Sequence, residues 1–334
     1  MPSVDTARAI LSALDDLGLT HVLYCPGSRS APFAYALESG AFGGHAMPVL
    51  DERGAGFAAV GLARTGALPA VIVTSGTAVA ELTPAVLEAS HARLPLLVIS
   101  ADRPGELRGV GASQATFQSG LFGVHARACV DLEPQEPSRA LVGQLSRAVA
   151  AACGAPTGTP GPVQINVAFR DPLTPQSRAS GAAGDSQDEA MASFVPRPTR
   201  VQPTNAAPER WEDVVGATRA GLILAGEGAS PLAAQWSRAS GFPLLAEPAS
   251  GAWAGGGVTP YEQAIVSSPL AGEVDTVVVT GRPTLSRPIH ALLARPDVRV
   301  VVVDAHAPWV DISGNASVVV PALAAPLRPT CGAE

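Results

Sequence analysis

The segment LYCPGSRSAPF, residues 23–33, passes from an apolar run into a turn that carries an arginine between two serines. Residues 21–26 (HVLYCP) are typical of a buried strand, and residues 31–39 are typical of a helix. Pro26 and Gly27 mark the turn between them. A strand, a turn and a helix in this order form the repeating unit of parallel α/β folds.

Apolar runs and alanine-rich helical stretches alternate through the rest of the first half. Nearly continuous apolar strands between helices are typical of a parallel sheet that is covered on both faces. Further strands are expected at MPVLD (47–51), PAVIVTS (69–75), LPLLVISA (94–101) and PVQINVA (162–168), and further helices over residues 54–65, 77–92 and 137–152.

The second half repeats the alternation, so the expected fold class is α/β with two doubly wound parallel-sheet domains. We predict domains at residues 1–172 and 211–334, joined by a Pro/Ser/Ala-rich linker over residues 173–210 that is expected to be partly disordered. Strands of the second domain are expected in AGLILAGEG (220–228), PLLAEP (243–248), VDTVVVTGRP (274–283), VRVVVVDA (298–305) and ASVVVPAL (316–323), with helices over 231–240 and 288–294.

Composition excludes several classes of function. The net charge of −7 argues against a nucleic-acid binder, which needs a basic face. No stretch approaches the roughly 20 apolar residues that span a bilayer, so no membrane insertion is expected. The start of the chain lacks the features of a secretory signal, and the four scattered cysteines form no CxxC pair. These features favour a cytoplasmic protein. No histidine, cysteine or acidic residue has metal-ligand spacing, so no metal site is expected within the chain.

Polar side chains follow the first and fourth predicted strands, where ligands of a parallel sheet bind. Ser28 and Arg29 follow the first strand, Arg103 follows the fourth, and Gln114 comes soon after. A guanidinium is a planar partner for a carboxylate, so two arginines and an amide suit a small molecule with more than one carboxylate. The alternative is a capped helix with an exposed arginine.

The second and third strands are also followed by polar groups. Glu52 opens a Gly/Ala-rich helix, and the structural alternative is that Asp51 caps this helix while Glu52 complements its dipole. Residues 74–77 (TSGT) form a glycine-containing turn with three hydroxyls, whose alternative role is simple helix capping. The glycines of GAGFAAVG (54–61) do not have dinucleotide-binding spacing.

Taken together, these motifs resemble the MenD family, the thiamine-diphosphate-dependent 2-succinyl-5-enolpyruvyl-6-hydroxy-3-cyclohexene-1-carboxylate synthases of menaquinone biosynthesis. The resemblance is strong up to about Leu173 and continues more weakly into the second half. It rests on CPGSRSAP, LDERGAGFAAVGLA, TSGTAVAEL, LPLLVISADRPGELRGVGASQAT and GPVQINVAFRDPL, and later on TGRPTLSRP and DISGN.

The resemblance implies a pyrimidine-binding domain, a Rossmann-like central domain and roles for single residues. Glu52 would be the catalytic glutamate that hydrogen-bonds the aminopyrimidine of thiamine diphosphate. The loop of Thr74, Ser75, Gly76 and Thr77 would lie beside that ring. Isochorismate, which reacts with a fragment of 2-oxoglutarate, would be held by Ser28, Arg29, Arg103 and Gln114.

The family also has a diphosphate-binding domain, with a GDG…NN motif for Mg²⁺ or Mn²⁺, which this sequence lacks. The resemblance therefore implies a fragment that is inactive alone, whereas the full-length protein would form a homodimer or a dimer of dimers. It also suggests Arg93 and Arg282 as a regulatory site for a naphthoate product. The alternatives are an enzyme of the acetolactate-synthase type and a non-catalytic module that senses an acidic ligand.

Overall fold

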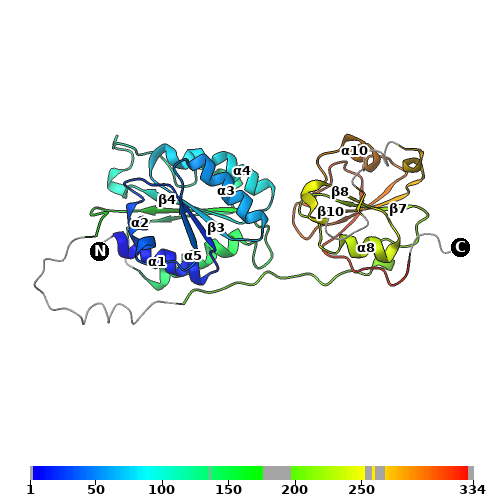
Figure 1. Cartoon of the computed structure of the whole chain (residues 1–334), viewed down its shortest axis with the longest axis horizontal. Helices are drawn as coiled ribbons and strands as arrows, with labels where there is room; N and C mark the ends of the chain where they lie inside the picture. Colours follow the sequence, from blue (N-terminus) through cyan, green and yellow to red (C-terminus); the bar gives the residue numbers. More distant parts are fainter. Residues whose placement is uncertain (1–2, 135–136, 176–196, 253–257, 260–267, 330–334) are drawn as a thin grey trace, which may run out of the picture. The chain divides into compact units, whose positions relative to one another are not determined.

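The structure, a computed structural model, describes residues 3–134, 137–175, 197–252, 258–259 and 268–329. The chain divides into two compact units, Met1–Thr204 and Asn205–Glu334. Each unit contains a six-stranded, parallel sheet with helices on its faces, which confirms the predicted α/β class (Figure 1).

The first unit has the strand order β2-β1-β3-β4-β6-β5. Figure 1 shows α3 and α4 on one face of this sheet and α1, α2 and α5 on the other. Its elements are α1 (Ser3–Asp16), β1 (His21–Tyr24), α2 (Ala31–Glu38), β2 (His45–Pro48), α3 (Glu52–Arg64), β3 (Pro69–Val73), the 3₁₀ helix η1 (Gly76–Leu82), α4 (Thr83–His91), β4 (Leu96–Asp102), the 3₁₀ helices η2 (Gly105–Leu107) and η3 (Gly123–His125), β5 (Ala128–Leu132), α5 (Arg139–Ala152) and β6 (Pro162–Ala168).

The central strands of the first unit are buried on both faces, because helices cover the sheet from both sides. Every residue of β3, β4 and β6 is buried. Side chains of α1 and α5, such as Ile10 and Leu145, pack on one face, and side chains of η1 and α4, such as Leu82 and Val86, pack on the other. This double layer fixes the carboxyl ends of the strands, where the loops of interest begin.

The second unit has the strand order β12-β11-β10-β7-β8-β9. The two helices labelled on it in Figure 1, α8 and α10, lie on opposite faces of the sheet. Its elements are α7 (Trp211–Val214), β7 (Gly221–Ala225), α8 (Ala233–Ser240), β8 (Leu244–Ala246), the 3₁₀ helix η4 (Pro248–Ser250), β9 (Val258–Thr259), the 3₁₀ helix η6 (Pro269–Glu273), β10 (Thr276–Thr280), α10 (Arg287–Leu293), β11 (Arg299–Val303) and β12 (Ala316–Val320).

The ends of the predicted linker, residues 173–210, are tied to the two units. Thr199 N donates to Ser146 Oγ at 3.1 Å, and Thr204 N donates to Pro156 O at 2.6 Å, so both belong to the first unit. Glu209 N donates to Ala322 O at 2.9 Å in the second unit. The middle of this segment, for which we predicted disorder, lies outside the described residues.

Some sequence-based element boundaries were wrong. Strand β2 begins at His45 rather than at residue 47, and the single helix predicted over residues 77–92 is a 3₁₀ helix followed by α4. Helix α1 and strand β5 were not predicted. Both additions extend the α/β pattern without changing the fold class.

Candidate active site

The turns after β1 and β3 meet at the topological switch point of the first sheet. From β1 the chain moves to β2 on one side, whereas β3 and β4 lie on the other side, and ligands of such sheets bind at this reversal. A Cβ atom built on Gly27 would lie 2.4 Å from Thr74 Cβ. The turn after β1 therefore needs glycine to pack directly against the turn after β3.

The hydroxyl groups of Thr74 and Ser75 are buried and unpaired. Neither Thr74 Oγ1 nor Ser75 Oγ has a hydrogen-bond partner in the described part of the chain. Ser75 precedes η1 and makes no side-chain capping bond, so the alternative of simple helix capping fails for these two residues. An unpaired buried hydroxyl costs about 1–3 kcal/mol, and such groups in a native protein call for a partner. Two hydroxyls are thus available for a polar ligand.

Arg29 is a buried cation at the same switch point. Only 7% of the residue is exposed, and its Nη1 donates to Phe169 O, beyond the end of β6, at 2.9 Å. Its Nε atom is buried and has no hydrogen-bond partner among the described residues. Burial and the charge of Arg103 lower the pKa of Arg29, whereas Asp171 and Asp102 raise it. Arg29 therefore has one unpaired hydrogen-bond donor, Nε, and a second cation, Arg103, nearby.

Arg103 and Gln114 belong to one long loop that follows β4. Arg103 donates from Nε to Ser113 O at 2.6 Å and also from Nη2, which fixes the loop next to Gln114. Gln114 has a positive φ of 53° and donates from Nε2 to Ser75 O at 3.0 Å. Gln114, which we predicted to bind isochorismate, thus contacts the loop of residues 74–77, which we predicted to lie beside the cofactor.

Gln118, which sequence analysis missed, connects this loop to the sheet. It is 1% exposed, its Oε1 accepts from Gly76 N at 2.8 Å, and its Nε2 donates to Ala101 O at 3.2 Å and to Asn166 Oδ1 at 3.0 Å. Gln164 Nε2 in turn donates to Gln118 O at 2.7 Å. The available signal was the pair of polar residues in the apolar strand PVQINVA, because buried polar groups require partners.

The rest of this buried network holds Asp102. Its Oδ1 accepts from Arg103 N at 2.7 Å, and its Oδ2 accepts from Asn166 Nδ2 at 2.9 Å. Arg108 Nε lies 3.2 Å from the same Oδ2 atom. The negative charge of Asp102 is therefore compensated within the protein.

Glu52 is the first residue of α3, and its carboxylate has no structural role in capping. Asp51 Oδ1 accepts from Gly54 N at 3.1 Å, so Asp51 is the cap that the sequence suggested. The half-buried Glu52 has no hydrogen-bond or salt-bridge partner in the described ranges. The Glu52 carboxylate is therefore available to a ligand.

Cys25 shows where the charge of Glu52 is felt. Burial, together with the smaller effects of the charges of Glu52 and Asp51, raises the pKa of the Cys25 thiol to about 12. The thiol is therefore protonated at neutral pH and is not a nucleophile. Glu52 must lie near the carboxyl end of β1, beside the switch point.

Other predicted residues contribute less to this arrangement. The side chains of Ser28 and Thr77 are exposed and make no hydrogen bond within the described residues. Ser30 precedes α2 without a side-chain capping bond; it is buried, and its hydroxyl donates to Gly27 O at 3.1 Å. Ser30 stabilises the turn instead.

The two predicted regulatory arginines lie in different units. Arg93 has a positive φ of 56°. The pKa of the partly buried Arg127 is lowered mainly by burial and also by the charge of Arg93. Arg282 Nη2 donates to Glu227 Oε2 at 2.7 Å. Gly226 permits this pairing, since a Cβ there would lie 2.1 Å from the Arg282 carbonyl carbon. Arg282 is thus engaged within its own unit.

The described residues contain neither a metal-binding cluster nor a membrane-spanning helix. No group of three or more His, Cys, Asp and Glu side chains in these ranges is arranged to hold a metal ion. None of the helices described above combines the length and apolar character needed to cross a membrane.

Known proteins are similar to this chain over its first unit and beyond. Residues 4–122 match the thiamine pyrophosphate enzyme family, N-terminal TPP binding domain. Proteins called 2-succinyl-5-enolpyruvyl-6-hydroxy-3-cyclohexene-1-carboxylate synthase are similar along most or all of the chain. The one from Kineococcus radiotolerans is 44% identical over 100% of the chain, and that from Arthrobacter sp. is 45% identical over 89%. The chain covers 60% and 49% of these relatives, so it spans about half of their length.

Proposed function

Since its sequence belongs to the family of 2-succinyl-5-enolpyruvyl-6-hydroxy-3-cyclohexene-1-carboxylate synthases, we propose that the chain forms the pyrimidine-binding and central domains of such an enzyme, acting in menaquinone biosynthesis in the cytoplasm. The observation that carries this proposal is the hydrogen bond from Gln114 to Ser75 O. It joins the residues proposed for the acceptor substrate to those proposed for the cofactor. One site can then serve both.

The residues at the switch point fit the aminopyrimidine end of thiamine diphosphate. When bound, this cofactor supplies a nucleophilic carbon that releases CO₂ from a 2-oxo acid and transfers the remaining fragment. Glu52 would hold a proton against a ring nitrogen through its spare carboxylate. Thr74 Oγ1 and Ser75 Oγ, which are buried and unpaired, would gain polar partners. Gly76 and Thr77 continue this loop.

The acceptor substrate, isochorismate, would bind beside Arg29. We propose that isochorismate, which has two carboxylates, is held by Arg29 and Arg103, with Gln114 and Ser28 as further hydrogen-bond donors. The buried Nε of Arg29 provides a donor that can pair with a carboxylate, and charge-assisted bonds are the strongest available in such a site. 2-Oxoglutarate would be the other substrate.

The diphosphate end of the cofactor needs groups that we do not identify in this sequence. No GDG segment followed by paired asparagines occurs in it. We propose that Mg²⁺ or Mn²⁺ and the diphosphate are held by residues outside these 334, in a homodimer or a dimer of dimers. Regulation by a naphthoate through Arg93 and Arg282 stays a prediction, and the Arg282–Glu227 pair gives Arg282 a structural role as well.

Residues 1–334 alone are expected to be inactive. With isochorismate, 2-oxoglutarate, thiamine diphosphate and Mg²⁺, they should form no product above background, because the diphosphate lacks its anchorage. Chromatographic detection of product checks this, with a cooperative thermal transition as proof of folding. Turnover that rises with protein concentration and is abolished by Glu52→Gln would contradict the expectation.

Isochorismate binding is expected to depend on Arg29. Arg29→Met should weaken binding at least about tenfold, which corresponds to the loss of one hydrogen bond to a charged group. Titration calorimetry on the wild type and the variant measures the change. Arg64→Met is the matched control, because Arg64 pairs with Glu88 on the surface between α3 and α4.

The same titration distinguishes the alternatives. Equal binding by wild type and Arg29→Met would reject the acceptor site. A preference for pyruvate over isochorismate would favour an enzyme of the acetolactate-synthase type. Tight isochorismate binding by a natural protein that has no thiamine-dependent activity would favour a sensor.

A further inference from the structure

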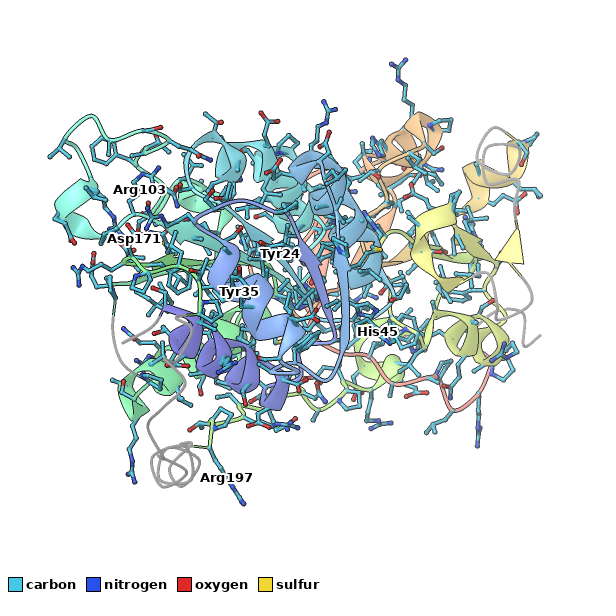
Figure 2. All side chains as sticks on the ribbon, turned by 60° about the vertical axis from the view of Figure 1, so that its left-hand side comes forward. Tyr24, Tyr35, His45, Arg103, Asp171 and Arg197 are labelled. Carbon is cyan, nitrogen blue, oxygen red and sulfur yellow. The ribbon has the colours of Figure 1, made fainter. Side chains whose placement is uncertain are left out.

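Asp171 is an exposed carboxylate that faces the buried Arg29. Its Oδ1 lies 3.9 Å from Arg29 Nη1, and the Asp171 side chain is 74% exposed, whereas that of Arg29 is 9% exposed. A separation of 3.9 Å is too long for a hydrogen bond, so the attraction is purely Coulombic. Figure 2 shows Asp171 and Arg103 toward the same end of the first unit. An exposed negative charge thus lies where a ligand's carboxylate is expected.

Asp102, the other carboxylate near Arg29, cannot serve as an exchangeable partner for it. Asp102 also raises the pKa of Arg29, but its two oxygens are occupied by Arg103 N, Asn166 Nδ2 and Arg108. Asp102 is buried and stays in place. Asp171 has no hydrogen bond to its carboxylate within the described residues, so it can move away at little cost.

The opposing forces on Arg29 explain why such a group is useful. Burial and the positive charge of Arg103 both disfavour the Arg29 cation, whereas the charge of Asp171 favours it. Because Arg29 already donates to Phe169 O, its position is fixed without help from Asp171. The contribution of Asp171 is therefore one of charge rather than of geometry.

We infer that Asp171 is an internal counter-ion that compensates Arg29 in the empty site and is replaced by a carboxylate of the bound substrate. This inference rests on the proposed function, since it takes Arg29 as the receptor of an isochorismate carboxylate. Asp171 then lowers affinity for anions and does so more for a dianion than for a monoanion, because its charge opposes each negative group. It is a specificity-determining residue that does not itself bind the substrate.

The test is the affinity of Asp171→Asn for two anions. Isochorismate should bind about two- to fivefold more tightly than to wild type, which is the range expected for one partly exposed ion pair. Benzoate, with one carboxylate, should gain less. The gains should shrink as salt rises from about 20 to 500 mM, because screening removes the effect of the lost charge.

Glu88→Gln is the matched control. Glu88 is another partly exposed carboxylate paired with an arginine, Arg64, and its loss changes the net charge equally. We expect no change in either affinity. Both variants should keep one cooperative thermal transition, because both carboxylates are partly exposed and each takes part in a surface ion pair.

The outcomes separate the inference from the proposed function. Unchanged or weaker isochorismate binding by Asp171→Asn, with wild-type binding that depends on Arg29, overturns the inference and leaves the proposed site intact. An equal gain for benzoate and isochorismate also overturns it. No isochorismate binding by either protein overturns both.

Discussion

In the full-length enzyme proposed above, replacing Glu52 by glutamine is expected to lower kcat by about 10²–10⁴-fold while leaving the fold unchanged. Glutamine keeps the size of the side chain but removes the carboxylate that we propose to hold a proton at the cofactor ring. The fold should be unaffected, because Asp51 caps α3 and Glu52 has no partner of its own in the described ranges.

Two measurements check this prediction. The first is steady-state kcat, and the second is the rate at which the thiazolium C2 proton of the cofactor exchanges with solvent deuterium, which needs no substrate. Both should fall in Glu52→Gln. Asp51→Asn is the control, because asparagine caps a helix as well as aspartate does. A variant Glu52→Gln with normal exchange and kcat would remove Glu52 from the catalytic machinery.

The sequence predicted the sheet well because burial on both faces leaves a direct signal. Runs such as PAVIVTS and LPLLVISA are apolar throughout, and their strands β3 and β4 are completely buried. Strand β5 was missed because its residues alternate between more and less exposed positions and include a cysteine and an aspartate. Strand β2 was shifted because its four residues are all exposed, so burial does not fix its boundaries.

The candidate site was predictable in position but not in its contacts. Parallel strands bring their carboxyl ends to one edge, which was enough to group Arg29, Glu52 and Arg103. Asp51 was predictable as the cap of α3, whereas the absence of capping bonds at Thr74 and Ser75 depends on geometry that the sequence does not reveal. Helix η1 begins at Gly76, which has a φ of 86° and donates its N–H to Gln118, 42 positions away in the sequence.

Gln118 is the residue whose removal should destabilise the first unit most clearly through polar contacts. Gln118→Ala leaves Gly76 N without a buried partner and takes one donor away from Ala101 O and from Asn166 Oδ1. We expect the free energy of unfolding to fall by roughly 3 kcal/mol, because each unsatisfied buried group costs about 1–3 kcal/mol and the costs do not add fully. Chemical denaturation followed by circular dichroism measures the loss.

The same substitution should also reach the ligand site, since Gln118 ties the loop of Arg103 and Gln114 to the sheet. Isochorismate binding should weaken in Gln118→Ala even under conditions in which the protein is fully folded. Gln144→Ala is the matched control: Gln144 is a half-buried glutamine of α5 without a hydrogen-bond partner in the described residues, and alanine favours a helix. A loss below about 0.5 kcal/mol in Gln118→Ala, with unchanged binding, would mean that the loop is held by Arg103 and Gln114 without Gln118.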